Sequence, residues 1–248
     1  MIKNQRIYTI TSERLPKEFD DFTITHISDL HTEKLDEYDF EMIDGDIVVI
    51  TGDWIDGKQP DMSCIGTLNK ITERCPVYYV TGNHEAASMT EMYVLEQLLP
   101  QVNVLHNRSC ILKRNSAKIK LIGLDDMTYM EYRYGCNPCE PDDRLADFHM
   151  KDYSIVLLHD PKNIEHISKY DPDLVLSGHT HGGQFRLPKI GALYAPGQGF
   201  FPKYDSGHFK VNNTDLIISN GIGCSRINKR INCPAEINKI VLKSKTDN

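Results

Sequence analysis

Short apolar strands that end in polar loops are the feature that most restricts how this chain folds. Eight runs, each four to six residues long, are rich in the β-branched and apolar residues that buried strands contain. Five of these runs lead directly into a loop with carboxylate, amide or imidazole side chains. The eight runs cover residues 22–27, 46–50, 77–80, 119–124, 154–158, 173–176, 216–219 and 237–242.

Helical patterns alternate with several of these strands. The stretch 88–99 begins with Ser88 and Glu91 at the spacing of a capping box and continues with apolar residues on one face. Asp160 and Pro161 predict another helix start, with Asp160 as the N-cap and Pro161 as the first helical residue. This alternation predicts an α/β or α+β architecture in which helices cover the sheet.

The composition is that of an ordinary globular protein, with 40% hydrophobic and 25% charged residues. Because no repeat or Gly/Ser linker divides the chain, we expect one domain over residues 1–248. The N-terminal residues lack the apolar region of a secretory signal, and no apolar run is long enough to span a bilayer. We therefore predict a cytoplasmic protein without a transmembrane segment, and peripheral contact with a membrane stays open as an alternative.

Charge and cysteine content exclude some classes of function. The net charge is −7, and the basic residues of the second half are scattered, which is not typical of a nucleic-acid-binding surface. We therefore expect no nucleic-acid partner. The seven scattered cysteines do not predict a disulfide framework. Cys136 and Cys139 form one CxxC without the second pair of a zinc knuckle, and we interpret them as part of an incidental loop.

Loops at the ends of five strands carry the side chains that could bind a metal. Ligands typically bind beyond the carboxyl ends of strands in such sheets, so the five loops predict one shared site. A single loop of this kind would usually be a turn, and His159 alone would more often be a buried, hydrogen-bonded histidine. Five such loops together favour a metal site. They cover residues 28–31, 51–56, 81–85, 159–160 and 177–181.

The motifs in these loops resemble those of the calcineurin-like metallophosphoesterases. They are DLH at 29–31, GDWID at 52–56, GNHE at 82–85, the single histidine at 159 and GHTH at 178–181, in that order. The stretches GGQFRLPKIGALYAPGQGFFPKY and ISNGIGCSRINKRINCPAEINKIVL resemble the tail of bacterial phosphodiesterase-like members, some of which act on UDP-sugar lipids. The resemblance implies a two-sheet β-sandwich flanked by helices. It also implies a hydrolase that cleaves phosphate ester or pyrophosphate bonds at a dinuclear metal centre.

The resemblance also implies two sets of metal ligands that share Asp53. Asp53 would bridge the two metals, because only a carboxylate offers two anionic oxygens. Nitrogen and oxygen ligands without thiolate suit Mn, Fe, Zn or Co more than Mg or Ca. Two such ions clamp a phosphoryl group and generate hydroxide near neutral pH. The first set is Asp29, His31, Asp53 and His181, and the second is Asp53, Asn83, His159 and His179.

Two further residues of the motifs are implied to act beside the metals. His84 would not be a ligand but would face the leaving-group oxygen or a phosphate oxygen, as an acid or an electrostatic stabiliser. Asp56 would support a ligand or a loop from outside, since metal-bound imidazoles usually need an outer acceptor.

The glycines around the GHTH motif explain why two histidines can stand one residue apart. His179 and His181 are implied to point to different metals of the pair. Gly178, Gly182 and Gly183 would allow the tight backbone path that this requires.

The basic and aromatic stretch after the GHTH motif predicts a substrate-binding rim. Arg226 and Arg230 are the candidates for holding the anionic remainder of a substrate, because a guanidinium can bind two oxygens at once. The alternative is that the aromatic residues are core and the cations form a solvated face.

The leading hypothesis is a dinuclear metal-dependent phosphohydrolase that cleaves a phosphodiester or a pyrophosphate by metal-activated hydroxide. Its substrate would be a phosphorylated small molecule or a lipid-linked one. The alternatives are a phosphomonoesterase or nuclease of the same fold, and a metal-binding scaffold without turnover. The presence of His84 and of every implied ligand argues against a scaffold, and the overall acidity argues against a nuclease.

Overall fold

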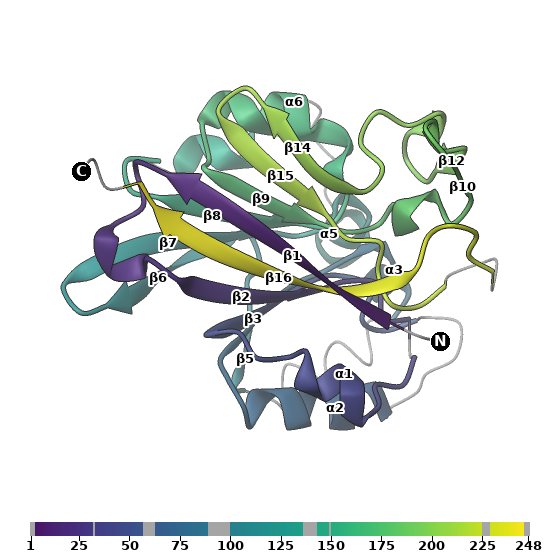
Figure 1. Cartoon of the computed structure of the whole chain (residues 1–248), viewed down its shortest axis with the longest axis horizontal. Coiled ribbons are helices and arrows are strands. Elements are labelled where there is room, and N and C mark those ends of the chain that lie inside the picture. The colour runs from purple at the N-terminus through teal and green to yellow at the C-terminus, as the bar shows by residue number, and fades with distance from the viewer. Residues whose placement is uncertain are drawn as a thin grey trace.

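Two six-stranded sheets pack face to face at the centre of the molecule (Figure 1). The computed structural model describes residues 3–31, 33–56, 63–88, 100–135, 143–148, 150–224 and 229–245. The first sheet contains, in spatial order, β1 (Lys3–Ser12), β16 (Ala235–Ser244), β2 (Phe22–Ile27), β3 (Ile47–Thr51), β4 (Val77–Val80) and β5 (Val102–Val104). The second contains β14 (Gly207–Val211), β15 (Thr214–Ile218), β9 (Leu174–Ser177), β8 (Ser154–Leu158), β7 (Ala117–Leu124) and β6 (Arg108–Arg114).

Short helices and two small hairpins complete the described part of the chain. The hairpins pair β10 (Arg186–Leu187) with β11 (Gly191–Ala192) and β12 (Tyr194–Ala195) with β13 (Gly199–Phe200). The α-helices are α1 (Glu37–Glu41), α2 (Ser63–Thr72), α3 (Asn83–Ala87), α5 (Met127–Tyr134) and α6 (Ile164–Ile167). The 3-10 turns are η1 (Lys17–Phe19), η2 (Arg144–Asp147), η3 (Pro161–Asn163), η4 (Ser168–Tyr170) and η5 (His181–Gly183).

Each sheet is buried on both faces, which explains why its central strands read as continuous apolar runs. Between the sheets, side chains such as Val49 of β3 and Ile155 of β8 form one cluster. On its outer face the first sheet packs against α2 through residues such as Leu68, and the second packs against α6 through Ile164. Figure 1 shows α1 and α2 below the sheets and α6 above them.

The strands that lead into the candidate site run parallel within each sheet. β2, β3 and β4 are parallel neighbours in the first sheet, and β7, β8 and β9 are parallel neighbours in the second. Their carboxyl ends therefore meet at one edge of each sheet, and contacts of β3 and β4 with β8 hold the two edges together.

The predicted fold class is confirmed: helices flank two packed sheets. The runs 22–27, 77–80 and 154–158 coincide with β2, β4 and β8, and the other five overlap strands whose ends differ by one or more residues. Sequence patterns missed β1, whose side chains are largely polar and exposed, although it pairs with β16 over ten residues.

The predicted helix starts had different outcomes. Asp160 does accept a hydrogen bond from the Lys162 N–H, with Pro161 as the first residue of a 3-10 turn that leads into α6. Ser88 does not open a helix within the described residues; it is the C-cap of α3, and the rest of 88–99 lies outside them. Cys136 and Cys139 also lie outside the described residues.

In the ranges that the structure describes, no helix is both long and apolar enough to cross a bilayer.

Candidate metal centre

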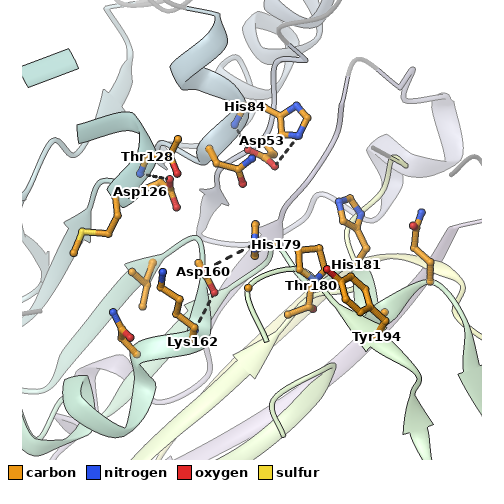
Figure 2. A pocket seen from close by; sticks show the side chains of 18 of the residues that line it. Asp53, His84, Asp126, Thr128, Asp160, Lys162, His179, Thr180, His181 and Tyr194 are labelled. Atoms are coloured by element: carbon orange, nitrogen blue, oxygen red, sulfur yellow. Dashed lines mark hydrogen bonds and ion pairs between the residues drawn. The ribbon is translucent and has the colours of Figure 1, made fainter. Parts of the chain in front are cut away.

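The five polar loops bring their side chains together where the carboxyl edges of the two sheets meet. Figure 2 shows Asp53 and His84 from the first sheet opposite His179 and His181 from the second. Seven side chains predicted as ligands lie here and form two donor clusters around Asp53. We call them the Asp29 cluster and the Asp53 cluster.

The Asp29 cluster consists of Asp29, His31 and His181, which each offer a ligand atom within 4.8 Å of the others. The Nε2 atoms of His31 and His181 are 3.2 Å apart. Asp29 Oδ1 lies 3.5 Å from His181 Nε2 and 3.9 Å from His31 Nε2. All three side chains are buried, so water does not compete for these donor atoms.

The Asp53 cluster consists of Asp53, His159 and His179, which also meet within 4.8 Å. His159 Nε2 is 3.3 Å from Asp53 Oδ2 and 3.1 Å from His179 Nδ1. Asn83 Oδ1 lies 3.2 Å from the same His159 nitrogen and adds a fourth donor. The two histidines of the GHTH motif therefore face different clusters.

One oxygen of Asp53 lies between the clusters. Asp53 Oδ2 is 3.3 Å from His159 Nε2 and 3.7 Å from His31 Nε2. The other oxygen, Oδ1, accepts a hydrogen bond of 2.9 Å from the backbone N–H of His84. Asp53 Oδ2 is thus the oxygen nearest a histidine of each cluster, and the bridging role stays a prediction.

Burial and charge give the clusters the character of a cation site. Burial lowers the pKa of His31 to about 4 and that of His181 to about 3, so both rings are neutral and keep a lone pair for a ligand bond. Burial alone would raise the pKa of Asp53, but His159 and His31 hold it well below its usual range. For His159 the directions are reversed: burial alone would lower its pKa, but the charge of Asp53 raises it.

These donors fit divalent metal ions. Carboxylate, amide and imidazole donor atoms converge in two groups, and Asp53 Oδ2 lies near a histidine of each group. Nitrogen and oxygen donors without a thiolate are typical of transition-metal sites.

Hydrogen bonds from outside hold the donor atoms in place. His159 Nδ1 donates a hydrogen bond of 2.6 Å to the carbonyl oxygen of Thr51, which fixes the ring with Nε2 directed toward Asp53. Asp29 Oδ2 accepts hydrogen bonds from Ser28 Oγ at 2.6 Å and from the backbone N–H of His179 at 3.0 Å.

Glu85 is a supporting residue whose role the sequence analysis missed. Its Oε2 accepts hydrogen bonds from the backbone N–H groups of Asp53 at 2.9 Å and Gly82 at 2.6 Å, and its Oε1 accepts one from Ile55. Burial, and then the charge of Asp53, raise the pKa of Glu85. The available signal was the capping-box spacing of Glu85 after Gly82, which indicates a carboxylate turned toward backbone donors.

The backbone is strained at the residues that provide the donors. Positive φ angles are uncommon for residues other than glycine and cluster at functional sites. Five donor residues have positive φ: Asp29 (51°), His31 (47°), Asp53 (52°), His179 (67°) and His181 (50°). After His181, Gly182 (φ 58°) and Gly183 (φ 74°) also have positive φ, and a Cβ on Gly178 would overlap Ser28 Oγ.

His84 lies beside both clusters at the surface of a cavity. Its Nε2 is 4.0 Å from Asp53 Oδ2, and its Nδ1 is 3.2 Å from Asp56 Oδ1. Asp56 therefore supports His84. His31, Asp56 and His84 also offer ligand atoms within 4.8 Å of one another, so the geometry permits His84 to act as a metal ligand.

The cavity has a volume of about 720 Å³ and is lined by Asp53, Asn83, His84, His179 and His181 at its base. Arg144 and Lys162 lie in its wall and were not identified from the sequence. Neither follows a motif loop, so no local signal marked them.

Of the two predicted substrate contacts, Arg230 is not among the described residues that line this cavity. Arg226 lies outside the described residues. Arg230 donates to the carbonyl oxygens of Asn220 and Gly223, and its Nη2 is 3.5 Å from His181 Nδ1. This position favours support of the His181 loop, and a contact of Arg230 with substrate stays a prediction.

Comparison with known proteins identifies the family. The family model for calcineurin-like phosphoesterases matches residues 22–183, which hold every motif of the two clusters. The chain belongs to the calcineurin-like phosphoesterase family. It is therefore a metal-dependent phosphoesterase, a hydrolase that acts on phosphate esters and uses divalent metal ions.

Individual relatives agree with this family. The chain is 30% identical to the uncharacterized metallophosphoesterase YkuE of Bacillus subtilis, over 96% of this chain and 84% of YkuE. It is 26% identical to the phosphodiesterase YaeI of Escherichia coli, over 79% of this chain and 70% of YaeI. Among solved structures, the calcineurin-like phosphoesterase YfkN of Bacillus subtilis shares the fold with a TM-score of 0.52 and 14% identity, over 81% of each chain.

Proposed function

We propose that residues 1–248 form a single metallophosphoesterase domain that cleaves a phosphodiester or a pyrophosphate at two metal ions. The observation that carries this proposal is the pair of donor clusters on either side of Asp53 Oδ2, with His84 beside them at the base of a large cavity. Mn, Fe, Zn and Co are the ions that suit the donors.

The seven donors divide between two ions. Asp53 would belong to both, since its Oδ2 lies near a histidine of each cluster. When bound, such a pair of ions polarises the phosphoryl group and lowers the pKa of a water molecule. Asp29, His31 and His181 would hold one ion, and Asn83, His159 and His179 the other.

His84 would act on the substrate and not on the metals. Asp56 contacts Nδ1 and fixes the orientation of the ring, so Nε2 points toward the side of Asp53 where the phosphate would lie. From there Nε2 would donate a proton or a hydrogen bond to the leaving-group oxygen.

The shape of the cavity favours a substrate with two substituents on phosphorus. A phosphate group alone fills only a small part of about 720 Å³. The cavity extends from Asp53 and His179 toward Asp126 and Thr128 on one side and toward Tyr194 on the other (Figure 2). A diester or a pyrophosphate places one group on each side, whereas a monoester would leave one side empty. The similarity to the phosphodiesterase YaeI supports the same choice.

The Tyr194 side of the cavity favours a lipid-linked substrate and peripheral contact with a membrane. Tyr194 packs edge to face on Phe200, with ring centroids 5.5 Å apart, and Phe200 is 77% exposed. Phe201 and Ile190 are also largely exposed on the same two hairpins, next to the exposed Lys189. Exposed apolar side chains with a cation are typical of surfaces that insert into lipid headgroups. A cytoplasmic location stays a prediction from the sequence.

A metal analysis combined with a substrate panel tests the proposal. We expect about two transition-metal ions per chain and loss of activity in a strong chelator. In the panel, bis(4-nitrophenyl) phosphate and its pyrophosphate analogue should be cleaved faster than 4-nitrophenyl phosphate and single-stranded DNA. Activity without metal would contradict the metal assignment. A preference for the monoester or for DNA would favour the phosphomonoesterase or the nuclease instead.

A further inference from the structure

One wall of the cavity carries two cationic side chains that metal binding does not use. Arg144 is the first residue of η2, and Lys162 lies in η3. Both line the cavity. Arg144 contacts the carbonyl oxygen of Asp125, next to Asp126, and Figure 2 labels Lys162 and Asp126 in the cavity. Metal ions in the two clusters would already bind the phosphoryl group that is cleaved, so these two cations are available for a different part of the substrate.

Hydrogen bonds at Nη1 anchor the guanidinium of Arg144. Its Nη1 donates to Asn107 Oδ1 at 2.8 Å and to the carbonyl oxygen of Asp125 at 2.7 Å, and it lies 3.1 Å from Met130 Sδ. Since the guanidinium is planar, anchoring one nitrogen fixes the plane of the whole fork. The arginine is therefore positioned at the cavity wall.

A buried network supports this anchor. Asp125 is fully buried and accepts hydrogen bonds from Thr81 Oγ1 at 2.8 Å, from Asn107 Nδ2 at 3.3 Å and from His106 Nδ1 at 3.0 Å. The backbone N–H of Asp125 donates to Asn107 Oδ1 at 3.0 Å, the atom that also anchors Arg144. A buried carboxylate is costly unless it is hydrogen-bonded in this way. Asp125 accepts its hydrogen bonds from Thr81 and His106 without Arg144, so the network positions Arg144 and does not depend on it.

The acidic residues of the same wall are engaged as helix caps. Asp126 Oδ1 accepts a hydrogen bond of 2.8 Å from the Thr128 N–H, and Asp160 Oδ1 accepts one of 3.0 Å from the Lys162 N–H. Backbone donors therefore stabilise both carboxylates, and their presence is explained without a substrate.

We propose that Arg144 and Lys162 form a subsite for the second phosphoryl group of a pyrophosphate substrate. The proposal rests on the proposed function and narrows it from diester or pyrophosphate to pyrophosphate. The guanidinium fork can bind two oxygens of a phosphoryl group at once, while the lysine supplies a point charge. A diester with a single phosphoryl group has no second group to place there.

Two substrates that differ by one phosphoryl group test the subsite. They are bis(4-nitrophenyl) phosphate and P1,P2-bis(4-nitrophenyl) pyrophosphate, which carry the same two aryl groups. In Arg144→Gln, kcat/KM for the pyrophosphate should fall at least about tenfold, mainly through KM, because a hydrogen bond to a charged group is lost. The value for the diester should change less than about threefold. Lys162→Gln should show the same selectivity with a smaller loss.

Matched variants and a binding measurement complete the test. Arg108→Gln, at an exposed position of β6 away from the described lining of the cavity, should affect neither substrate. Arg144→Lys, which keeps the charge but not the fork, should give an intermediate loss. Metal content and Tm should match the wild type in every variant. Calorimetry should show binding of the pyrophosphate weakened at least about tenfold in Arg144→Gln.

Each contrary result identifies what has failed. Equal losses on both substrates would overturn the subsite and give Arg144 a general structural role. Cleavage of the diester without cleavage of the pyrophosphate would overturn the subsite while the proposed function survived. If neither substrate were cleaved, the proposed function would be contradicted, and an unchanged Kd for the pyrophosphate in Arg144→Gln would then also overturn the subsite.

Discussion

The donor clusters and the outer rim of the cavity are built in opposite ways. In the clusters, Asp29 and His159 are fully buried, and hydrogen bonds hold their donor atoms. At the rim, Phe200 and Phe201 are 77% and 67% exposed and stand on hairpins whose strands have only two residues each. The donors of the proposed reaction thus lie at the ends of the central sheets, where their atoms are fixed, while the surface proposed to meet the rest of a substrate lies on small hairpins.

The largest expected effect is at the residue that both clusters share. Asp53→Asn removes the negative charge and keeps the shape of the side chain. Because Asp53 Oδ2 lies near both clusters, we expect both to lose metal. Mutation of a residue that only supports a metal ligand costs up to about 10²-fold in activity, so loss of a shared ligand should reduce turnover by more than that. Elemental analysis and bis(4-nitrophenyl) phosphate turnover measure these effects.

Asp152→Asn is the matched control, since Asp152 lies in an exposed ion pair with Lys118. It should keep both metals and full activity. If Asp53→Asn emptied only one cluster and turnover stayed near the wild-type level, Asp53 would not be shared.

The clusters could be predicted from sequence because each donor stands within a few residues of a strand end. Asp53 and His159 follow strands that their apolar runs predict. Parallel pairing brings the carboxyl ends of neighbouring strands to one edge of each sheet. Local sequence did not predict that Asp53 would hold Oδ2 near both clusters while Oδ1 accepts a backbone hydrogen bond. That arrangement depends on the His84 N–H, which comes from a different strand loop.

The second largest effect on turnover is expected for His84→Ala, which should leave metal binding intact. His84→Ala should keep near-normal metal content and reduce turnover by roughly 10² or more, as expected for a positioned acid or base. His166→Ala on α6, whose Nε2 pairs with Asp143 outside the described lining of the cavity, is the control and should be active. Metal loss in His84→Ala would make it a ligand with His31 and Asp56, the alternative grouping that the geometry permits.

The rim could not be predicted in the same way. Asn107 and Asp125, distant in the sequence, hold the Nη1 of Arg144 at the cavity, and no sequence pattern around residue 144 predicts these contacts. Arg230 was a candidate for substrate binding as a cation of the stretch that follows the GHTH motif, and the structure adds hydrogen bonds from its Nη1 and Nη2 to the carbonyl oxygens of Asn220 and Gly223. Long-range packing, which local patterns do not encode, decides both cases.

The smallest effect on turnover is expected at the rim, where the same change should alter binding to lipid. Phe200→Ser combined with Phe201→Ser removes two exposed rings from the hairpins. Burying a phenylalanine in an apolar environment contributes about 1.5–3 kcal/mol, so sedimentation with phosphatidylglycerol vesicles should weaken at least about tenfold. Turnover of bis(4-nitrophenyl) phosphate in solution should stay within about twofold, because the donors are untouched.

Tyr38→Ser is the matched control for the rim. Tyr38 is 75% exposed but lies on α1, which covers the outer face of the first sheet, so its loss should not change vesicle binding. If the wild-type protein did not bind vesicles, or if the double variant bound them equally well, the proposed contact of the rim with lipid would be contradicted. The exposed rings would then contact only the soluble remainder of a substrate, and the Tyr194–Phe200 pair would mark the end of the cavity.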